Sequence, residues 1–410
     1  MIETKFKHTD IGLVPEEWEV KTLEEVSSFP TESILTSNIK TSEYVGTDNM
    51  VSDRGGILPF DNTLPYIRVR HYVNNDILTS NIRPYLKKIW LSNREGGCSS
   101  DVLVIRPKTN IVMPNFLFTV ISSDNFFKYS NDNAKGTKMP RGDKHYILKY
   151  GIPIPPLSEQ RRIASTLMKV DALISNLDKL IQKKQAIKKG AMQELLTGRK
   201  RLPGFKGKWK TQKLNEIACS KAGKNINLNY ELHGIYPCYG GNGIRSYISH
   251  YSHEGTFPII GRQGELCGNV QLAKGKFYAT EHAVVCQPYS DIDAEWLYYQ
   301  LISANLNQYK TGNAQPGLSV EKIEKEVTLH VPFCSEQRAI AHVLSTMDSD
   351  ISAVETKRDK YRQIKQGMMR DLLTGRIRLV ETSDMERKSY TVSVQKNLFD
   401  GAIAAEPHPD

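Results

Sequence analysis

The sequence predicts an α+β protein in which two mixed α and β domains are separated by two long helices that pair as an antiparallel coiled coil, in a pseudo-twofold repeat. The first observation is an internal repeat. A shift of 177 residues aligns 158–202 with 335–379 without a gap, and 22 of the 45 aligned positions are identical. The second is a heptad-like apolar spacing within each copy, and the third is an alternation of strand-like and helix-like runs before each copy.

The repeat divides the 410 residues into five parts. Residues 1–156 and 201–333 are predicted to form the two domains, and residues 157–200 and 334–378 the helical spacers. Residues 379–410 lie outside the repeat and lean acidic, so we expect this tail to be at least partly disordered.

The first domain opens with a turn and a tryptophan, Trp18, followed by an apolar step to Leu23. Runs rich in β-branched residues at Tyr66–Val69 and Val102–Ile105 predict strands, and Asn115–Tyr129 predicts a helix. A proline-bearing strand closes the domain and leads directly into the first spacer.

The first spacer has the seam of a helix that packs along its length against another helix. Apolar residues recur there at steps of four and three: Ile163, Leu167, Val170, Ile174, Leu177 and Ile181. After a polar break the stepping resumes at Ile187 and ends at Leu195. About 40 helical residues form a rod of roughly 60 Å, too long to bury its seam against one small domain, so we expect the two rods to pair.

The second domain repeats this frame around a different interior. Trp209 follows a turn, Phe257–Ile260 and Ala283–Cys286 predict strands, and Ala294–Tyr309 predicts a helix. A protein that recognises two different targets would have two such domains, with matching frames and different interiors.

The second spacer follows the first, with a seam that starts at Ile340 and resumes at Ile364. Ser158 and Ser335 are predicted N-cap residues. Gly198 and Gly375 stand where C-cap glycines belong. The capping signals therefore predict where both helices begin and end.

Composition and motifs restrict the class of protein. The formal charge of +10 favours a polyanion partner without requiring one. The sequence has no signal-peptide or membrane-spanning run, which predicts a cytoplasmic protein without membrane contact. The six cysteines are widely spaced and predict structural thiols, with no metal site. We find no phosphate-binding loop, nucleophile elbow or nuclease-like carboxylate cluster, so no catalytic residue is predicted.

Polar loops in both domains combine guanidinium, ammonium and amide groups, which bind phosphates and the edges of bases. A plainer interpretation is that they are β-turn glycines beside solvated charges. The candidate DNA-contact residues are Arg83, Lys87, Lys88, Lys138, Arg141, Asn242, Arg245, Arg262 and Gln263.

Two repeated motifs give the sequence a resemblance to a known family. SEQRRIA with ELLTGR, repeated once and each time preceded by a variable domain, is similar to the specificity subunit of type I restriction-modification enzymes. The resemblance extends from Trp18 to about Leu379. Local segments such as SNIRPYLKKIW and GTKMPRGDK also resemble segments of that family's target-recognition domains.

The resemblance implies that each domain reads one half of a split, asymmetric site on double-stranded DNA. The helices would form a ruler between the halves and dock two methylation subunits, which restriction subunits then join. S-adenosylmethionine, ATP and Mg²⁺ would be used by those partners and not by this chain. The implied docking candidates lie at the helix ends: Glu159, Gln160, Arg161, Arg199, Glu336, Gln337, Arg338 and Arg376.

Two alternatives remain open on the sequence alone. A self-contained DNA-modifying enzyme would bind S-adenosylmethionine or cut DNA by itself, and the missing motifs argue against it. A coiled-coil scaffold that joins two domains without DNA affinity would show no salt-dependent retention on DNA.

Overall fold

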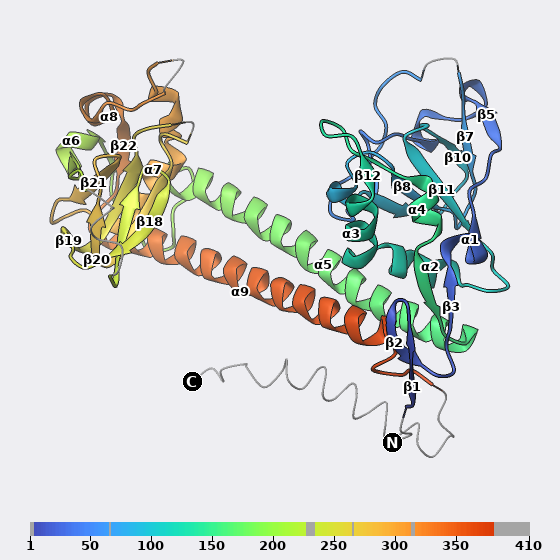
Figure 1. Ribbon diagram of the computed structural model, residues 1–410. Helices are drawn as coiled ribbons and strands as arrows, with labels where there is room; N and C mark the ends of the chain where they lie inside the picture. The colour runs from blue at the N-terminus through green and yellow to red at the C-terminus, as the bar shows by residue number, and fades with distance from the viewer. Residues whose placement is uncertain (1–3, 65–66, 227–233, 265, 313–315, 381–410) are drawn as a thin grey trace. The chain divides into compact units, whose positions relative to one another are not determined.

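The computed structural model describes five stretches of the chain: residues 4–64, 67–226, 234–264, 266–312 and 316–380 (Figure 1). The chain divides into two compact units, unit 1 with Met1–Ser175 and Asp359–Asp410, and unit 2 with Asn176–Arg358. Each unit contains one globular segment and part of both long helices, α5 (Leu157–Leu195) and α9 (Cys334–Leu373). The predicted disordered tail lies, from residue 381 on, outside the described residues.

Unit 1 contains two four-stranded sheets. The first has the order β5 (Ser33–Leu35), β7 (Arg68–Tyr72), β10 (Gly96–Cys98) and β6 (Tyr44–Val45). The second has the order β4 (Ser27–Ser28), β11 (Val102–Pro107), β8 (Ile77–Ser80) and β9 (Ile89–Leu91). The predicted strand at 102–105 is therefore part of β11. The strand predicted at 66–69 begins two residues later, and Tyr66 lies outside the described residues.

The helix predicted over Asn115–Tyr129 is two helices, α2 (Pro114–Ile121) and α3 (Asp124–Asp132). The break follows from Ser123, whose hydroxyl accepts a hydrogen bond from the backbone N–H of Phe126 at 3.2 Å and so caps a new helix. Buried Phe116 and Phe126 pack on opposite sides of this break in one core with Trp18.

The two domains share a frame, as the sequence predicts. In unit 1, β3 (Glu19–Thr22) pairs antiparallel with β14 (Gly151–Ile154), which leads into α5, and α1 (Leu23–Val26) follows β3. In unit 2, β15 (Lys210–Lys213) pairs with β22 (Thr328–Val331), which leads into α9, and α6 (Leu214–Ile217) follows β15. Unit 1 adds an N-terminal hairpin of β1 (Phe6–Thr9) and β2 (Gly12–Pro15).

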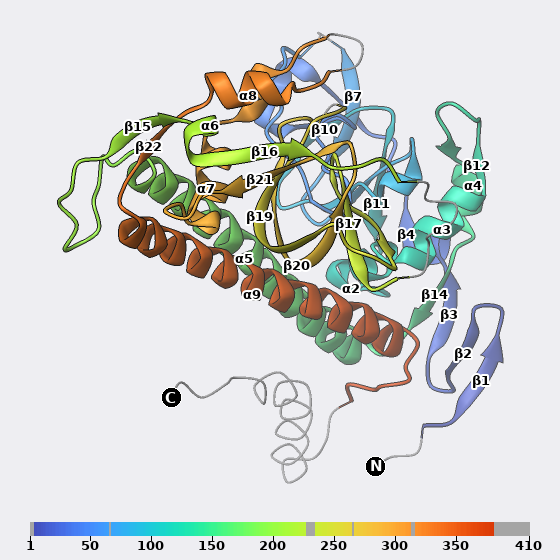
Figure 2. The ribbon, with the colours of Figure 1, turned by 90° about the vertical axis from the view of Figure 1, so that its left-hand side faces the viewer.

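Unit 2 contains one six-stranded sheet (Figure 2). Its order is β16 (Ala218–Ala222), β21 (Ala283–Pro288), β19 (His253–Gly261), β20 (Val270–Ala279), β17 (Tyr236–Gly240) and β18 (Gly243–Ile248). The predicted strands at 257–260 and 283–286 lie in β19 and β21. The interiors of the two domains thus differ in sheet architecture within a shared frame.

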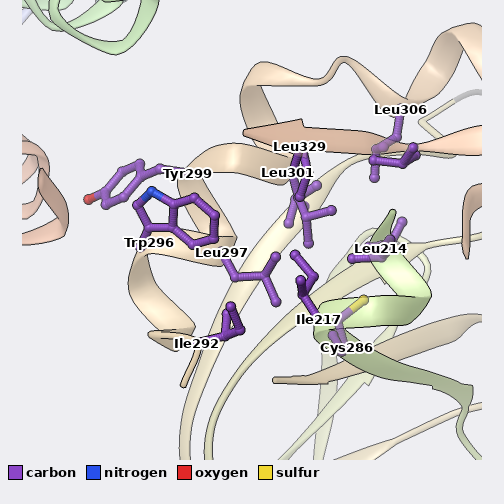
Figure 3. Close-up of a cluster of buried hydrophobic side chains, with 14 of the residues drawn as sticks. Leu214, Ile217, Cys286, Ile292, Trp296, Leu297, Tyr299, Leu301, Leu306 and Leu329 are labelled. Atoms are coloured by element: carbon purple, nitrogen blue, oxygen red, sulfur yellow. The ribbon is translucent and has the colours of Figure 1, made fainter. Parts of the chain in front are cut away.

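The core of unit 2 is built around α7 (Ala294–Ser303), which packs between the sheet and the helix segments (Figure 3). Trp296 and Leu297 are fully buried there beside Leu344 of α9. The predicted helix over 294–309 ends at Ser303, because Asn305 adopts left-handed backbone angles (φ 46°) that an α-helix cannot continue. A 3₁₀ turn, η5 (Leu306–Tyr309), and α8 (Val320–Glu326) follow.

The long helices begin at the residue before each predicted N-cap serine, so Ser158 and Ser335 lie in the first turn and the N-cap prediction is wrong. The backbone N–H of Gln160 bonds to the carbonyl of Pro156, and that of Gln337 bonds to Phe333, which places the helix start one residue earlier. The predicted C-cap glycines are confirmed: Gly198 and Gly375 have φ of 71° and 70°, the left-handed angles that favour glycine.

The seam of α5 does not resume at Ile187, whose side chain is 53% exposed. The steps of four and three continue instead from Ile181 through Lys184 and Lys188, and both lysines reach acidic residues of α9. Lys184 pairs with Asp350 at 3.0 Å, and Lys188 pairs with Asp348. The apparent polar break is therefore a charged part of the same seam.

In α9 the same stepping passes through Arg358, which pairs with Asp178 of α5 at 3.5 Å within unit 2. Along this unit the partner numbers on α9 fall as those on α5 rise, so the two helix segments run in opposite directions. In unit 1, Lys365 pairs with Asp171 at 2.5 Å. This pair is the repeat equivalent of Lys188 and Asp348.

Two further sequence expectations concern membranes and thiols. Within the described stretches, no helix has the length and apolar content needed to cross a membrane. Burial raises the pKa of the Cys98 and Cys286 thiols to about 12, so both stay protonated at neutral pH and have low reactivity.

Candidate nucleic-acid interface

In unit 1 the two predicted contact loops are adjacent in space. Ile82 and Arg141 form an antiparallel bridge, and the backbone N–H of Arg83 donates to the carbonyl of Pro140 at 2.8 Å. The N–H of Gly142, at the end of β13 (Arg141–Gly142), donates to the carbonyl of Asn81 at 2.9 Å. Two basic segments more than fifty residues apart in the sequence therefore form one surface.

The loop that carries Arg83 is held in an uncommon backbone conformation. Arg83 and Lys87 flank a 3₁₀ turn, η3 (Pro84–Leu86), and both are left-handed, with φ of 50° and 51°. Asp53 and Arg54 are left-handed too, and their N–H groups donate to the carbonyls of Leu86 and Lys87 at 2.9 Å. Such conformations cost about 1–3 kcal/mol each and persist only where surrounding contacts fix them. The loop is therefore preorganised.

The predicted contacts of unit 1 separate into exposed and internal groups. Arg83 and Lys138 are exposed, and Arg141 is 59% exposed although it pairs with Asp101 at 2.9 Å. The half-buried ammonium groups of Lys87 and Lys88 are bound internally. Lys87 pairs with Asp124 at 2.6 Å, and Lys88 donates to the carbonyl of Thr47. These bonds hold the loop, and Lys87 and Lys88 stay DNA-contact candidates beside Arg83.

Asp124 lies at the start of α3 and joins two cations. It accepts from Lys87 and from Arg54, each at 2.6 Å, and these hydrogen bonds lower the pKa of the Asp124 carboxyl. A carboxyl whose pKa is lower in the folded than in the unfolded state stabilises the fold above its unfolded pKa of about 3.9. That stabilisation is lost as the pH falls through the folded pKa.

We expect Asp124→Asn to lower the free energy of unfolding by about 1 kcal/mol or less at pH 7, because the carboxylate is half exposed. The difference from the wild type should shrink as the pH falls through the folded pKa of Asp124, because the protonated carboxyl is neutral like the amide. Urea titrations at pH 7 and over a series of acid pH values measure it. A difference that persisted at low pH would mean that the amide disturbs packing and not charge.

In unit 2 the two predicted glycine-containing loops are also in contact. Gly241 and Asn242 form the turn between β17 and β18, and Gly261 ends β19. A Cβ on Gly261 would lie 1.8 Å from the carbonyl oxygen of Gly241, so only glycine permits this approach. Asn242, Arg245 and Gln263 are exposed around this contact, and Arg262 is half-buried.

Backbone bonds hold the second loop of unit 2. The N–H of Arg262 donates to the carbonyl of His282 at 3.0 Å, and its carbonyl accepts from Leu318 at 2.8 Å. Gln263 forms a bridge with Gly317. The side chains of Arg262 and Gln263 thus project from a fixed backbone, as Arg83 does in unit 1.

We expect Gly261→Ala to destabilise unit 2 by about 1–3 kcal/mol, because the methyl group must displace the backbone of Gly241. Gly190→Ala is the matched control, since Gly190 lies inside α5, in its last two turns, and a Cβ there would meet no atom within 4 Å. That control should raise stability by up to about 1 kcal/mol through helix propensity. Thermal unfolding of both variants distinguishes the outcomes, and equal midpoints would contradict the steric argument.

Four of the docking candidates are buried. The side chains of Glu159, Gln160, Glu336 and Gln337 are 0–2% exposed, so the expectation that they present a docking surface is corrected. Each glutamate binds an arginine and a tryptophan of its own unit. The other four candidates remain exposed: Arg161, Arg199, Arg338 and Arg376.

In unit 1, Arg378 donates two hydrogen bonds to the Glu159 carboxylate, at 2.8 and 2.9 Å, and the Trp18 indole N–H donates a third at 3.2 Å. The guanidinium carbon of Arg378 lies 5.5 Å from the centroid of the Trp18 ring. The hydrogen bonds to Glu159 raise the pKa of Arg378. We call Trp18, Glu159 and Arg378 the first triad.

In unit 2, Arg201 donates to the Glu336 carboxylate at 2.5 and 2.6 Å, and the Trp209 indole N–H donates at 3.1 Å. The Arg201 guanidinium carbon lies 5.3 Å from the Trp209 ring centroid. These residues form the second triad. Sequence reasoning missed both arginines, although they occupy identical positions of the repeat.

Gln160 and Gln337 also have matching internal roles. Gln160 donates to the carbonyl of Ile111 at 3.1 Å and accepts from the N–H of Met113 at 2.8 Å. Gln337 donates to the carbonyl of Asp291 at 3.2 Å and accepts from Asp293 at 2.7 Å. Each glutamine thus ties the segment before α2 or α7 to a long helix.

Among the described residues, no group of three or more His, Cys, Asp or Glu side chains could hold a metal ion. What the structure offers is a set of cationic side chains on preorganised loops in unit 1, and of cationic and amide side chains in unit 2. This arrangement is suited to binding a polyanion.

Comparisons with known proteins identify the family of the chain. The family model of the type I restriction modification DNA specificity domain matches residues 15–189 and 206–365. The EcoprrI specificity subunit of Escherichia coli is 48% identical over 148 residues, which are 35% of this chain and 36% of that protein. The MjaVIII specificity subunit of Methanocaldococcus jannaschii is 25% identical over 324 residues, 70% of this chain and 75% of that protein. The match to the EcoprrI subunit thus spans little more than a third of its length.

Two solved structures share the fold. The S subunit of a type I restriction-modification system from M. genitalium gives a TM-score of 0.62 at 16% identity, covering 93% of this chain and 100% of that chain. A chain from a structure that describes complex assembly and conformational transition of the type I R-M system gives a TM-score of 0.54 at 21% identity, covering 89% of this chain and 99% of that chain. Because the family model matches both halves of the sequence, the chain belongs to the family of type I restriction-modification DNA specificity subunits.

Proposed function

We propose that this specificity subunit reads a bipartite, asymmetric site on double-stranded DNA, one half with the domain of unit 1 and the other with the domain of unit 2. The observation that carries the proposal is that each domain brings two polar loops together in one exposed surface. Arginine and lysine there suit phosphates, and arginine, asparagine and glutamine suit guanine and adenine edges. The different sheet architectures of the two domains support two different half sites.

The long helices act, in this proposal, as an antiparallel coiled coil with pseudo-twofold symmetry. Two observations support it. The seam of each helix keeps steps of four and three residues, and the ion pair between Lys188 and Asp348 has its repeat equivalent in Lys365 and Asp171. A pseudo-twofold offers the same surface twice in opposite directions, which suits two copies of one methylation subunit. Arg161, Arg199, Arg338 and Arg376 remain the docking candidates, and restriction subunits complete the assembly.

The helices also suit the role of a ruler. Adjacent major-groove readers lie about 34 Å apart, one helical turn of DNA. A helix of roughly 60 Å can hold two domains at such a separation. Phosphate contacts would supply most of the affinity and a few base contacts the sequence preference.

The chain itself is proposed to be non-catalytic and to bind no cofactor. S-adenosylmethionine, ATP and Mg²⁺ would act on the methylation and restriction subunits. Purified chain that methylated or cut DNA without partners would overturn this part of the proposal.

The test is to co-express the chain with the methylation subunit from the same source in a host that lacks DNA methylation, and to map modified adenine by single-molecule sequencing. We expect a split, asymmetric motif with one modified base in each half. Unmodified DNA together with a stable complex would favour the scaffold alternative and overturn the reading function.

A further inference from the structure

Each triad joins three separate chain segments. The glutamate lies in the first turn of one long helix, the tryptophan lies at the start of the domain, and the arginine follows the end of the other long helix. Glu159 of α5 thus binds Arg378, which follows α9, and Glu336 of α9 binds Arg201, which follows α5. Every triad therefore ties a domain to both helix segments of its unit.

The contacts in a triad are directional. A bidentate arginine–carboxylate pair fixes two planes against each other, and the indole N–H adds a third direction. In unit 2, α7 adds two more directional contacts: Gln300 donates to the carbonyl of Leu196 at 2.9 Å and Tyr299 donates to Asp348 at 2.8 Å. Both units also have apolar packing between the domain and the helices, and apolar burial is non-directional. The triads, with the neighbouring glutamines, are thus the directional contacts that recur in both units and orient each domain on its helices.

Burial excludes a surface role for the two carboxylates. The carboxylate side chains of Glu159 and Glu336 are each 2% exposed, and the Arg378 side chain is 10% exposed. The matching geometry in two domains with different sheets indicates that the frame requires the triad, whatever half site the domain reads.

Building on the proposed function, we propose that the two triads are positioning devices that set the DNA spacer length the subunit accepts. Trp18, Glu159 and Arg378 fix the domain of unit 1 to its helix segments, and Trp209, Glu336 and Arg201 do so in unit 2. A loosened triad lets its domain tilt, so that half sites at a wrong separation can both be reached.

The experiment uses the complex of the full chain with its methylation subunit and three DNA duplexes. One duplex carries the mapped site with its native spacer, and the others have spacers one base pair shorter and one longer. Arg378→Lys and Arg201→Lys keep the charge beside each buried glutamate but lose the bidentate fork. We expect each to reduce the ratio of affinities for native over altered spacers by at least about fivefold, a difference of about 1 kcal/mol.

Arg370→Lys and Lys183→Arg are the controls, since both side chains are exposed on a long helix, one in each unit, and neither belongs to a triad or to the docking candidates. They should leave the spacer ratio unchanged. The ratio separates positioning from stability, because a partly unfolded sample lowers the apparent affinity for all three duplexes equally. Trp18→Phe and Trp209→Phe remove one donor with little change in volume and serve as second variants.

An unchanged spacer ratio in the lysine and phenylalanine variants, with lowered thermal stability, would reduce the triads to structural contacts and overturn the inference alone. A wild-type complex without any bipartite motif would instead overturn the proposed function, and the inference with it.

Discussion

Replacing Glu159 by alanine is expected to lower the free energy of unfolding of unit 1 by about 3 kcal/mol, because the largely buried guanidinium of Arg378 keeps only the exposed carboxylate of Glu17, at 2.9 Å, as its partner. Arg378 loses both hydrogen bonds to Glu159, and the Trp18 indole N–H loses its acceptor. The equivalent Glu336→Ala should cost less, because the Arg201 side chain is 27% exposed and gains water more easily than Arg378 at 10%.

Urea titration followed by tryptophan fluorescence measures both effects. Trp18 and Trp90 report on unit 1, and Trp209 and Trp296 on unit 2. Glu194→Ala, at an exposed position of α5, is the control and should change stability by less than about 0.5 kcal/mol. A loss of similar size in the control and in Glu159→Ala would show that the triad contributes no more than an exposed helix residue.

The helices could be predicted from the sequence because local signals specify them. Caps, C-terminal glycines and a repeating apolar step need only neighbouring residues, and the observed starts differ by one residue from the predicted N-caps. Ile187 was assigned to the seam but is exposed, which shows that apolar residues alone do not define the seam. Lys184 and Lys188 occupy seam positions because aspartates of α9 neutralise them, and this compensation comes from another part of the chain.

The repeated SEQR motif was predicted to serve docking because a repeat does not distinguish an internal contact from a surface. Glu159 and Glu336 recur because each domain needs the same buried acceptor, and their arginine partners lie more than a hundred residues away. The meeting of Ile82 with Arg141 is likewise non-local, so the sequence predicted both loops and not their common surface. Lys87 and Lys88 could not be separated from Arg83 without knowing that Asp124 and Thr47 bind them.

The second large effect is expected on DNA affinity. Arg83→Ala with Arg141→Ala removes two exposed guanidinium groups from the surface where the two loops of unit 1 meet. Each lost base contact should cost about 1–3 kcal/mol, and each lost phosphate contact should reduce the slope of log affinity against log salt by about 1. The half site read by unit 1 should lose its sequence preference, whereas the half site read by unit 2 should keep it.

Titrations of the complex with labelled duplex between 50 and 200 mM salt measure the affinity and the salt slope together. Over this range of salt concentration, six to ten phosphate contacts change the affinity by roughly 10³-fold or more. Lys183→Ala is the control, because Lys183 is an exposed cation of α5 that belongs to neither loop. If the double variant and the control changed affinity and slope alike, the effect would be one of net charge. A larger loss confined to one half site would assign that half to the surface formed by Arg83 and Arg141, because net charge acts on both halves equally.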